Sequence, residues 1–270
     1  MKNLMKDNSK FLISKEPKYL QTSNEIKVFE AAWQNRVPLM LKGPTGSGKT
    51  RFIEHMAWKL KMPLMTVSCH EDMTASDLVG RFLLEGSETV WKDGPLTRAV
   101  RYGGICYLDE IVEARQDTTV VIHSLTDDRR ILPIEKTGEI IKAHKDFFLV
   151  ISYNPGYQSV LKDLKESTKQ RFASISFEYP NNQLEKDIII LESGTTKEIA
   201  EKLIKVSERT RNLKGKGLHE GASTRMLIAA AKLINSKLSF MEACLKAIVL
   251  PITDEQDVRD SLERAIRDLG

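Results

Sequence analysis

The residues with the clearest chemical potential form a glycine-rich run at 43–50, Gly-Pro-Thr-Gly-Ser-Gly-Lys-Thr. This run fits the pattern G-x-x-x-x-G-K-[ST], which binds nucleotide phosphates where it follows a buried strand and opens a helix. Glycines let backbone N–H groups approach phosphate oxygens, and the helix start adds the positive end of its dipole. We expect Lys49 to reach the β- and γ-phosphates of ATP and Thr50 to ligate Mg²⁺. A plain glycine turn would leave the Lys–Thr pair unexplained. The predicted nucleotide-binding residues of this run are Gly43, Pro44, Thr45, Gly46, Ser47, Gly48, Lys49 and Thr50.

A second candidate is an acidic pair, Asp109-Glu110, which follows the short apolar run 105–108. The carboxyl ends of parallel strands are the edge at which α/β sheets bind ligands. We expect Asp109 to hold Mg²⁺ through water and Glu110 to orient or deprotonate the attacking water. An acidic pair after a strand is more often a solvated loop when it stands alone. Here the acidic pair stands sixty residues after Lys49, at the end of a strand of the same inferred sheet that carries the glycine-rich run. This place favours the catalytic interpretation.

The elements that must position these residues alternate between short apolar strands and helices up to about Pro180. This alternation predicts an α/β fold with a parallel sheet. Helical periodicity alone follows, which predicts a smaller helical domain at 181–270. Residues 1–23 are polar and predict an arm that packs on the large domain, 24–180, whose first helix Ser23 or Asn24 can cap. The expected strands are 37–41, 63–68, 105–108, 147–152 and 173–177, and the expected helices include 50–60, 183–192, 197–211, 224–234, 240–249 and 255–269.

Composition excludes several classes of protein. Among 270 residues, 41 basic and 37 acidic side chains give a dispersed net charge of +4, which lacks the basic stripe of a nucleic-acid-binding protein. No apolar run approaches the roughly 18 residues of a membrane-spanning helix. The N-terminus lacks the pattern of a secretory signal, so a cytoplasmic location is expected.

Five segments together resemble an AAA+ ATPase of the MoxR branch: GPTGSGKT, ICYLDE, the asparagine of LVISYNPGYQS, STKQRF and the later STR. More narrowly, LDEIVEARQDTTVVIH and LKDLKESTKQRF resemble the CbbQ/NirQ/NorQ/GvpN family over residues 24–269, most closely its CbbQ branch. The resemblance implies an AAA+ αβα sandwich with a parallel sheet, followed by a smaller α-helical lid domain. It also implies a homo-hexameric ring and a larger partner with a von Willebrand factor A domain, CbbO-like or NorD-like.

The resemblance assigns roles to three further residues. Asn154 occupies the sensor 1 position, where its amide can bond the γ-phosphate and the lytic water. It could instead form a turn before Pro155-Gly156. Arg171 matches the arginine finger that enters the neighbouring subunit's site, although an ordinary surface arginine is the alternative. Arg225 matches sensor 2, which would tie the lid to the nucleotide.

Two further segments are candidates for contacts outside the nucleotide site. Residues 82–95 predict a β-hairpin that resembles the helix 2 insertion of MoxR-like proteins, and residues 131–144 resemble the hairpin before sensor 1. Either could contact a client or the partner, although Phe82, Leu84 and Trp91 could equally pack in the core. Arg129 and Arg130 could face a neighbouring subunit, but clustered charges at a helix end are more often solvated.

The resemblance implies an ATP-driven motor that remodels a client protein. For the CbbQ branch the client would be Rubisco, from which an inhibitory sugar phosphate is released. The alternative within the family is a NorQ/NirQ-like role in nitric oxide reductase maturation, by aiding metal insertion. A P-loop kinase for a small molecule is opposed by Glu110 and Arg171, and a nucleic-acid motor by the dispersed charge.

Overall fold

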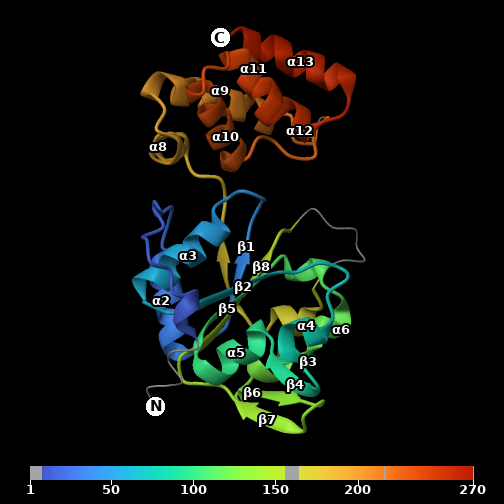
Figure 1. The fold of residues 1–270 in the computed structure, drawn as a ribbon. Helices are drawn as coiled ribbons and strands as arrows, with labels where there is room; N and C mark the ends of the chain where they lie inside the picture. Colours follow the sequence, from blue (N-terminus) through green and yellow to red (C-terminus); the bar gives the residue numbers. More distant parts are fainter. Residues whose placement is uncertain (1–7, 156–163, 216, 270) are drawn as a thin grey trace. The chain divides into compact units, whose positions relative to one another are not determined.

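The structure is a computed structural model that describes residues 8–155, 164–215 and 217–269, except for the side chains at 116 and 117. Figure 1 shows the course of the chain. The chain forms two compact units. The first contains the described residues up to Gly43 together with Gly48–Phe177, and the second contains Pro44–Ser47 and the described residues from Glu178 onward.

A five-stranded, wholly parallel sheet forms the centre of the first unit (Figure 1). In the order β2-β5-β8-β1-β9, its strands are Leu64–Ser68, Gly104–Asp109, Phe147–Tyr153, Leu39–Lys42 and Ala173–Ser176. Since all five run in the same direction, their carboxyl ends lie along one edge of the sheet. The predicted α/β fold with a parallel sheet is confirmed, and the strand ends differ from the expected ones by one or two residues.

Both faces of this sheet are buried. In β1, Met40 belongs to one apolar cluster, whereas Leu39 and Leu41 belong to the other. Helices α2 and α3 supply the second cluster, for example with Phe29 and Phe52, and helices α4 and α5 supply the first. Burial on both faces explains why the three central strands, β5, β8 and β1, are nearly continuous apolar runs. The two outer strands, β2 and β9, include exposed polar residues.

The helices of the first unit are mostly short. Helix α3 begins at Lys49, directly after the glycine-rich run, and buries Phe52, Ile53 and Met56 on one side. The α-helices are α2 (Glu25–Asn35), α3 (Lys49–Lys59), α4 (Ala75–Val79), α5 (Pro95–Tyr102), α6 (Gln116–Val120) and α7 (Glu166–Lys169). The 3₁₀ helices are η1 (Ser9–Phe11), η2 (Ile111–Glu113) and η3 (His123–Leu125).

The start of α2 differs from the prediction. Asn24 is the N-cap residue, but neither its side chain nor that of Ser23 bonds the helix N-terminus in the manner expected of a cap. Asn24 has φ −101° and ψ 14°, outside the extended region from which a cap side chain reaches the N3 amide. The buried carboxylate of Glu25 instead accepts bonds from the N–H groups of Thr22 and Ser23, both at 2.7 Å.

The described part of the N-terminal arm, residues 8–23, packs on the first unit. The Asn8 amide donates to the Gly103 carbonyl at 3.0 Å, and Phe11 contacts the first apolar cluster. Tyr19 lies against Phe52 with 5.4 Å between ring centroids, and its hydroxyl donates to Glu25 at 2.7 Å. The arm therefore adds side chains to a core that belongs to the sheet.

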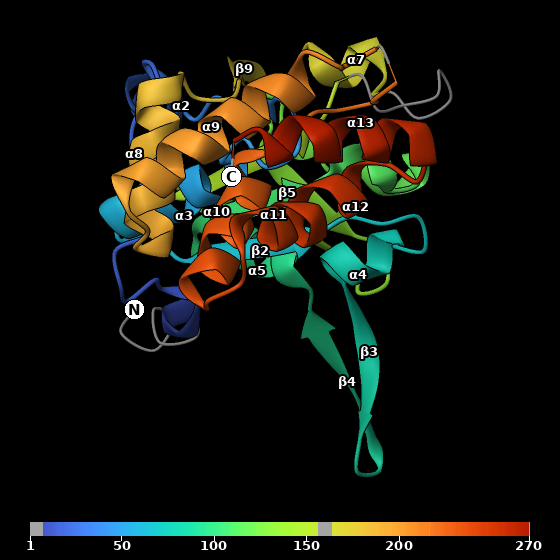
Figure 2. The same ribbon diagram turned by 90° about the horizontal axis from the view of Figure 1, so that it is seen from above.

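Two antiparallel hairpins leave the sheet: β3 (Gly80–Glu85) with β4 (Glu88–Asp93), and β6 (Ile131–Ile134) with β7 (Glu139–Lys142). Figure 2 shows β3 and β4 extending well away from the rest of the first unit. Phe82 is 47% exposed and Leu84 is 74% exposed. These two side chains therefore do not pack in the core, although Phe82 meets Trp91 edge-on at 5.2 Å.

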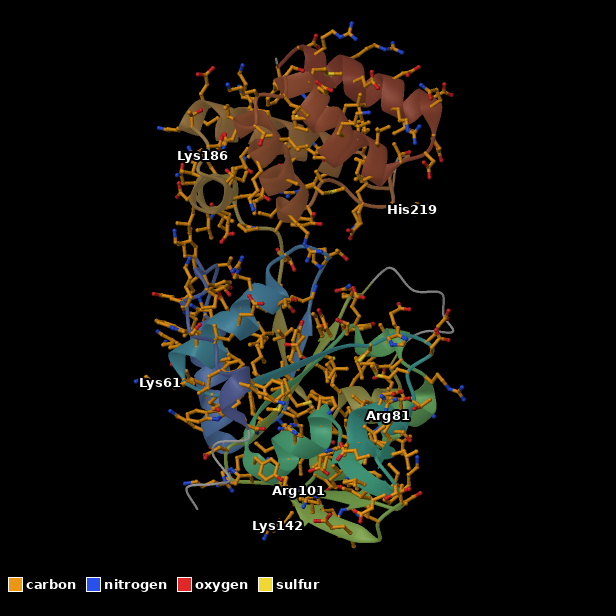
Figure 3. The ribbon with its side chains drawn as sticks, viewed as in Figure 1. Lys61, Arg81, Arg101, Lys142, Lys186 and His219 are labelled. Atoms are coloured by element: carbon orange, nitrogen blue, oxygen red, sulfur yellow. The ribbon has the colours of Figure 1, made fainter. Side chains whose placement is uncertain are left out.

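Arg101 of α5, labelled in Figure 3, joins both hairpins at the end of the first unit that carries β6 and β7. Its Nε donates to Asp93 of β4 at 2.9 Å. Its two terminal nitrogens donate to the Glu139 carboxylate of β7 at 2.6 and 2.8 Å. Asp93 also accepts a bond from the Trp91 indole at 2.8 Å. One guanidinium thus binds a residue from each hairpin.

The second unit is helical and packs around Ile189, Leu203, Leu227 and Ile248, all fully buried. The expected helix at 240–249 is interrupted by a π-helical turn, Leu245–Val249, before Pro251. Proline lacks an N–H and its ring clashes with the carbonyl four residues earlier, which disfavours regular α geometry there. The α-helices are α8 (Asn182–Ser193), α9 (Lys197–Arg211), α10 (Thr224–Asn235), α11 (Phe240–Cys244), α12 (Leu250–Ile252) and α13 (Gln256–Arg267). Among the described residues, no helix has the length and apolarity to cross a bilayer.

Candidate nucleotide site

The glycine-rich run connects β1 to α3, which is the context that phosphate binding requires. Gly43 has φ 152°, and a Cβ there would lie 2.3 Å from the Phe177 carbonyl oxygen. Gly48, with φ 93°, is the N-cap of α3. Only glycine fits at Gly43, because a side chain would collide with the main chain that follows β9.

Lys49 is the first residue of α3 and only 6% exposed. Its ammonium donates to the Gly43 carbonyl at 2.8 Å, so the lysine folds back over its own loop. A buried ammonium needs a compensating acceptor, and a phosphate at the helix N-terminus would be a stronger one than a carbonyl. The geometry fits an anion bound between the loop and the helix start.

Asp109 ends β5 and lies beside Thr50 of α3, with 3.3 Å between the Thr50 hydroxyl and Asp109 Oδ2. The Tyr107 hydroxyl donates to Asp109 Oδ1 at 2.7 Å. Burial, reinforced by the Asp109 charge, raises the pKa of the Tyr107 phenol, which therefore stays protonated and able to donate. A hydroxyl and a carboxylate oxygen side by side are suitable ligands for Mg²⁺, which takes one or two protein oxygens and completes its shell with water and phosphate.

No group of three or more His, Cys, Asp or Glu side chains that could hold a metal occurs among the described residues. The Mg²⁺ ligands predicted from the sequence, Thr50 and Asp109, are brought together from two separate elements.

Glu110 follows the strand in a left-handed conformation, with φ 55° and ψ 47°. Its N–H donates to the Ser152 hydroxyl at 2.7 Å. Its carboxylate lies 3.4 Å from the side-chain nitrogen of Asn154, the residue directly after β8. The structure thus brings Glu110 and Asn154 together at the carboxyl edge of adjacent strands.

The side-chain oxygen of Asn154 is buried and has no hydrogen-bond partner among the described residues. A buried acceptor without a partner is uncommon in proteins and points to a ligand or water that completes it. This favours the sensor interpretation over the turn-forming alternative. Gly156, the last residue of that expected turn, lies outside the described residues.

Arg171 lies between α7 and β9, and its contacts are with residues 123–127. One terminal nitrogen lies 3.4 Å from the His123 carbonyl and 3.8 Å from the Asp127 carboxylate. Its Nε is buried without a partner in the described part of the chain. Within the described residues, these side-chain contacts of Arg171 do not join it to Lys49, Asp109 or Glu110. The structure therefore separates Arg171 from the contacts that unite the other predicted site residues.

Arg129 and Arg130, adjacent in the sequence, differ in exposure and in their contacts. Arg129 is 65% exposed and pairs with Asp127 at 2.6 Å. Arg130 donates to the Phe147 carbonyl at 3.1 Å and lies over the Phe147 ring at 5.8 Å. Burial lowers the pKa of Arg130. Arg130 therefore packs on the start of β8, whereas Arg129 is exposed to solvent.

In the second unit, the segment Pro44–Ser47 lies beside the start of α10. A Cβ on Gly46 would come within 2.7 Å of Ser223 Cβ and 3.6 Å of Arg225 Cβ. The Tyr179 hydroxyl donates to the Thr45 carbonyl at 3.2 Å. Ser47 closes the turn by donating to the Pro44 carbonyl at 2.8 Å. Arg225 is exposed and lies close to Gly46.

A buried network holds the start of α10, and the sequence analysis did not identify it. The fully buried carboxylate of Glu185 accepts two bonds from Arg211, at 2.7 and 2.8 Å, and one from the Thr224 hydroxyl at 2.6 Å. Arg211 Nε also donates to the Ala222 carbonyl at 3.0 Å. One signal was present in the sequence: Glu185 occupies a core position of α8, four residues before the buried Ile189.

We expect Arg211→Ala to destabilise the second unit by about 3 to 5 kcal/mol, because it leaves the Glu185 carboxylate buried without its charge partner. Hydrogen exchange of α9 and α10 amides at increasing urea concentrations measures this loss. The matched control is Arg267→Ala, which removes an exposed guanidinium from α13 of the same unit. That control should change stability by no more than about 0.5 kcal/mol. Equal effects of the two substitutions would contradict the buried-pair argument.

Comparison with known proteins shows the class to which the chain belongs. The family described as "AAA domain (dynein-related subfamily)" matches residues 38–172, and the family described as "CbbQ/NirQ/NorQ C-terminal" matches residues 185–269. A RuvB variant from Thermotoga maritima has a similar fold, with a TM-score of 0.55 and 18% identity over 94% of this chain and 73% of RuvB. Fold and site together define an AAA+ ATPase.

Sequence identity to known proteins shows the family of AAA+ ATPases to which the chain belongs. Protein CbbQ of Hydrogenophilus thermoluteolus is 58% identical over 97% of this chain and 98% of its own. Protein NorQ of Paracoccus denitrificans is 53% identical over 94% and 93%. The denitrification regulatory protein NirQ of Pseudomonas aeruginosa is 54% identical over 88% and 92%. The chain belongs to the CbbQ/NirQ/NorQ family of AAA+ ATPases, which confirms the family predicted from the sequence.

Proposed function

We propose that this ATPase is a ring-forming motor that uses ATP hydrolysis to remodel a client protein. The observation that carries the proposal is the convergence of Thr50, Asp109, Glu110 and Asn154 at the carboxyl edge of the sheet, beside the lysine of the glycine-rich run. The proposed working parts are the arm 1–23, the nucleotide-binding domain 24–180 and the lid 181–270, in a cytoplasmic homo-hexamer.

The catalytic roles follow from the chemistry of each side chain. Lys49 and the backbone of the glycine-rich run hold the phosphates of ATP, and Thr50 and Asp109 hold Mg²⁺, partly through water. Bound Mg²⁺ would neutralise charge that develops on the phosphates. Glu110 orients and deprotonates the attacking water, and Asn154 bonds that water and the γ-phosphate.

Two arginines would connect hydrolysis to movement. Arg171 would act in the site of the adjoining subunit, since in the described part of the chain its side chain contacts His123 and Asp127, outside its own nucleotide site. Arg225, beside Gly46 in the second unit, would sense the nucleotide and move with the lid.

The exposed hairpin β3–β4 is the proposed contact surface for the client or for a partner with a von Willebrand factor A domain. Phe82, Leu83 and Leu84 are 47%, 38% and 74% exposed on one strand. Consecutive exposed apolar residues on a projecting strand are typical of a protein-binding surface. The binding of Arg101 to both hairpins supports a rigid attachment of this surface to α5.

Rubisco is the proposed client, with release of an inhibitory sugar phosphate as the result of remodelling. The support is the identity with Protein CbbQ, 58% over 97% of the chain. Protein NorQ is 53% identical over a similar span, which keeps nitric oxide reductase maturation by metal insertion as the second candidate.

A reconstitution tests the client. Rubisco inhibited by a sugar phosphate is mixed with this protein, ATP and a partner protein with a von Willebrand factor A domain, and carboxylation is followed. We expect recovery that requires ATP hydrolysis, with Lys49→Ala giving none and Leu84→Ser reducing recovery more than ATP turnover. An active ATPase that restores no Rubisco, but raises the metal content of nitric oxide reductase in a parallel assay, would reject Rubisco in favour of the second candidate.

A further inference from the structure

The hydroxyl of Ser152 bonds both members of the acidic pair. Ser152 lies in β8 and is fully buried. Its hydroxyl donates to Asp109 Oδ1 and accepts the N–H of Glu110 at 2.7 Å. The direction of both bonds is determined by chemistry, because a carboxylate only accepts and a backbone N–H only donates. One oxygen atom therefore joins the side chain of Asp109 to the main chain of Glu110.

The strand register explains why this residue occupies this position. In the ladder between β5 and β8, Leu108 pairs with Ile151, so the next residues along each strand are Asp109 and Ser152. At Glu110 the chain turns out of the sheet, and its N–H no longer has a backbone partner in the ladder. The Ser152 hydroxyl supplies the missing acceptor, which a buried N–H needs.

For Asp109, the consequence is a defined orientation of its carboxylate. Two hydroxyls, from Tyr107 and Ser152, bond Oδ1. Oδ2 is left on the side of Thr50, at 3.3 Å from its hydroxyl. Oδ1 thus faces the protein interior, and Oδ2 faces the proposed Mg²⁺ site.

For Glu110, the consequence is a stabilised left-handed backbone. Residues other than glycine rarely adopt φ near 55°, and such strain persists where surrounding bonds enforce it. This conformation ends the strand and lets the Glu110 carboxylate approach Asn154. A hydrogen bond to the Glu110 N–H keeps the backbone in place.

We infer that Ser152 is a positioning residue for ATP hydrolysis, which sets the Mg²⁺-facing oxygen of Asp109 and the backbone of Glu110 at the same time. The inference rests on the proposed roles of these two acidic residues. It assigns no contact between Ser152 and the nucleotide.

Ser152→Ala tests this inference. We expect kcat to fall by about tenfold or more, since two hydrogen bonds at charged or buried groups are lost. The affinity for a fluorescent ADP analogue should be unchanged in EDTA, whereas its gain on adding Mg²⁺ should shrink by about fivefold. Ser152→Thr keeps the hydroxyl and should recover most of the turnover. Tyr107→Phe removes only an Oδ1 bond, so it should lower kcat less than Ser152→Ala.

Two outcomes overturn the inference. One is a Ser152→Ala protein with the kcat and the Mg²⁺ dependence of the wild type. The other is a purely structural effect, in which Tm, turnover and ADP binding in EDTA all fall together and Ser152→Thr rescues none of them. Failure of the proposed function is seen separately, because Asp109→Asn and Glu110→Gln would then keep normal turnover.

Discussion

Glu110→Gln is expected to lower kcat by about 100- to 10,000-fold while ATP remains bound, because the amide cannot take the proton of the attacking water. Glutamine keeps the size of the side chain and leaves the Glu110 N–H free to bond Ser152. The substitution does not touch the glycine-rich run or the Thr50–Asp109 pair. Phosphate release under saturating ATP, with ATP affinity measured by calorimetry, gives both quantities.

Glu16→Gln is the matched control for this experiment. Glu16 is an exposed carboxylate in the N-terminal arm, so the same chemical change there should leave kcat and affinity as in the wild type. Turnover that survived Glu110→Gln would assign the base to another residue. A loss of ATP binding together with turnover would indicate that the carboxylate acts on the ground state.

Arg171→Ala is expected to lower turnover by roughly a thousandfold or more, since the guanidinium would stabilise phosphoryl charge in the adjoining subunit. The buried Nε without a partner, and the long 3.4 Å bond to the His123 carbonyl, describe a side chain that its own subunit holds loosely. Arg264→Ala, which removes an exposed guanidinium from α13, is the control and should leave turnover intact.

Mixing the Arg171→Ala protein with a Lys49→Ala protein distinguishes an arginine that acts in the adjoining subunit from one that acts in its own. The Arg171→Ala protein retains Lys49, and a Lys49→Ala protein retains Arg171. At equal amounts, random assembly gives roughly a quarter of the boundaries both an intact lysine and an intact arginine. Phosphate release should therefore reappear in the mixture. Two inactive proteins that stay inactive at every ratio would remove Arg171 from the neighbouring site.

Much of the fold was predictable because its signals are local. A parallel sheet buried on both faces needs continuous apolar strands, and 105–108 and 147–152 are such runs. The phosphate-binding run carries its own context, a strand before it and a helix after it. Asp109 and Glu110 were found because they end a strand, and the parallel topology places them beside Thr50 and Asn154.

The parts that the sequence analysis missed depend on contacts between distant residues. Ser152 bonds Glu110 across 42 positions, and Arg211 bonds Glu185 across 26. Asn24 is the N-cap residue of α2, as expected, but its side chain makes no cap bond because its backbone conformation is unsuitable. The π-helical turn before Pro251 has the apolar periodicity of an ordinary helix, so periodicity alone could not distinguish it.

The bonds of Arg101 to both hairpins affect how the hairpins can move. Two hairpins that leave a domain at separate points normally flex independently, but here one arginine side chain links Asp93 to Glu139 through three hydrogen bonds. A force on the tip of one hairpin is therefore transmitted through Arg101 to the other hairpin. We expect the two hairpins to move together with α5 as one rigid body.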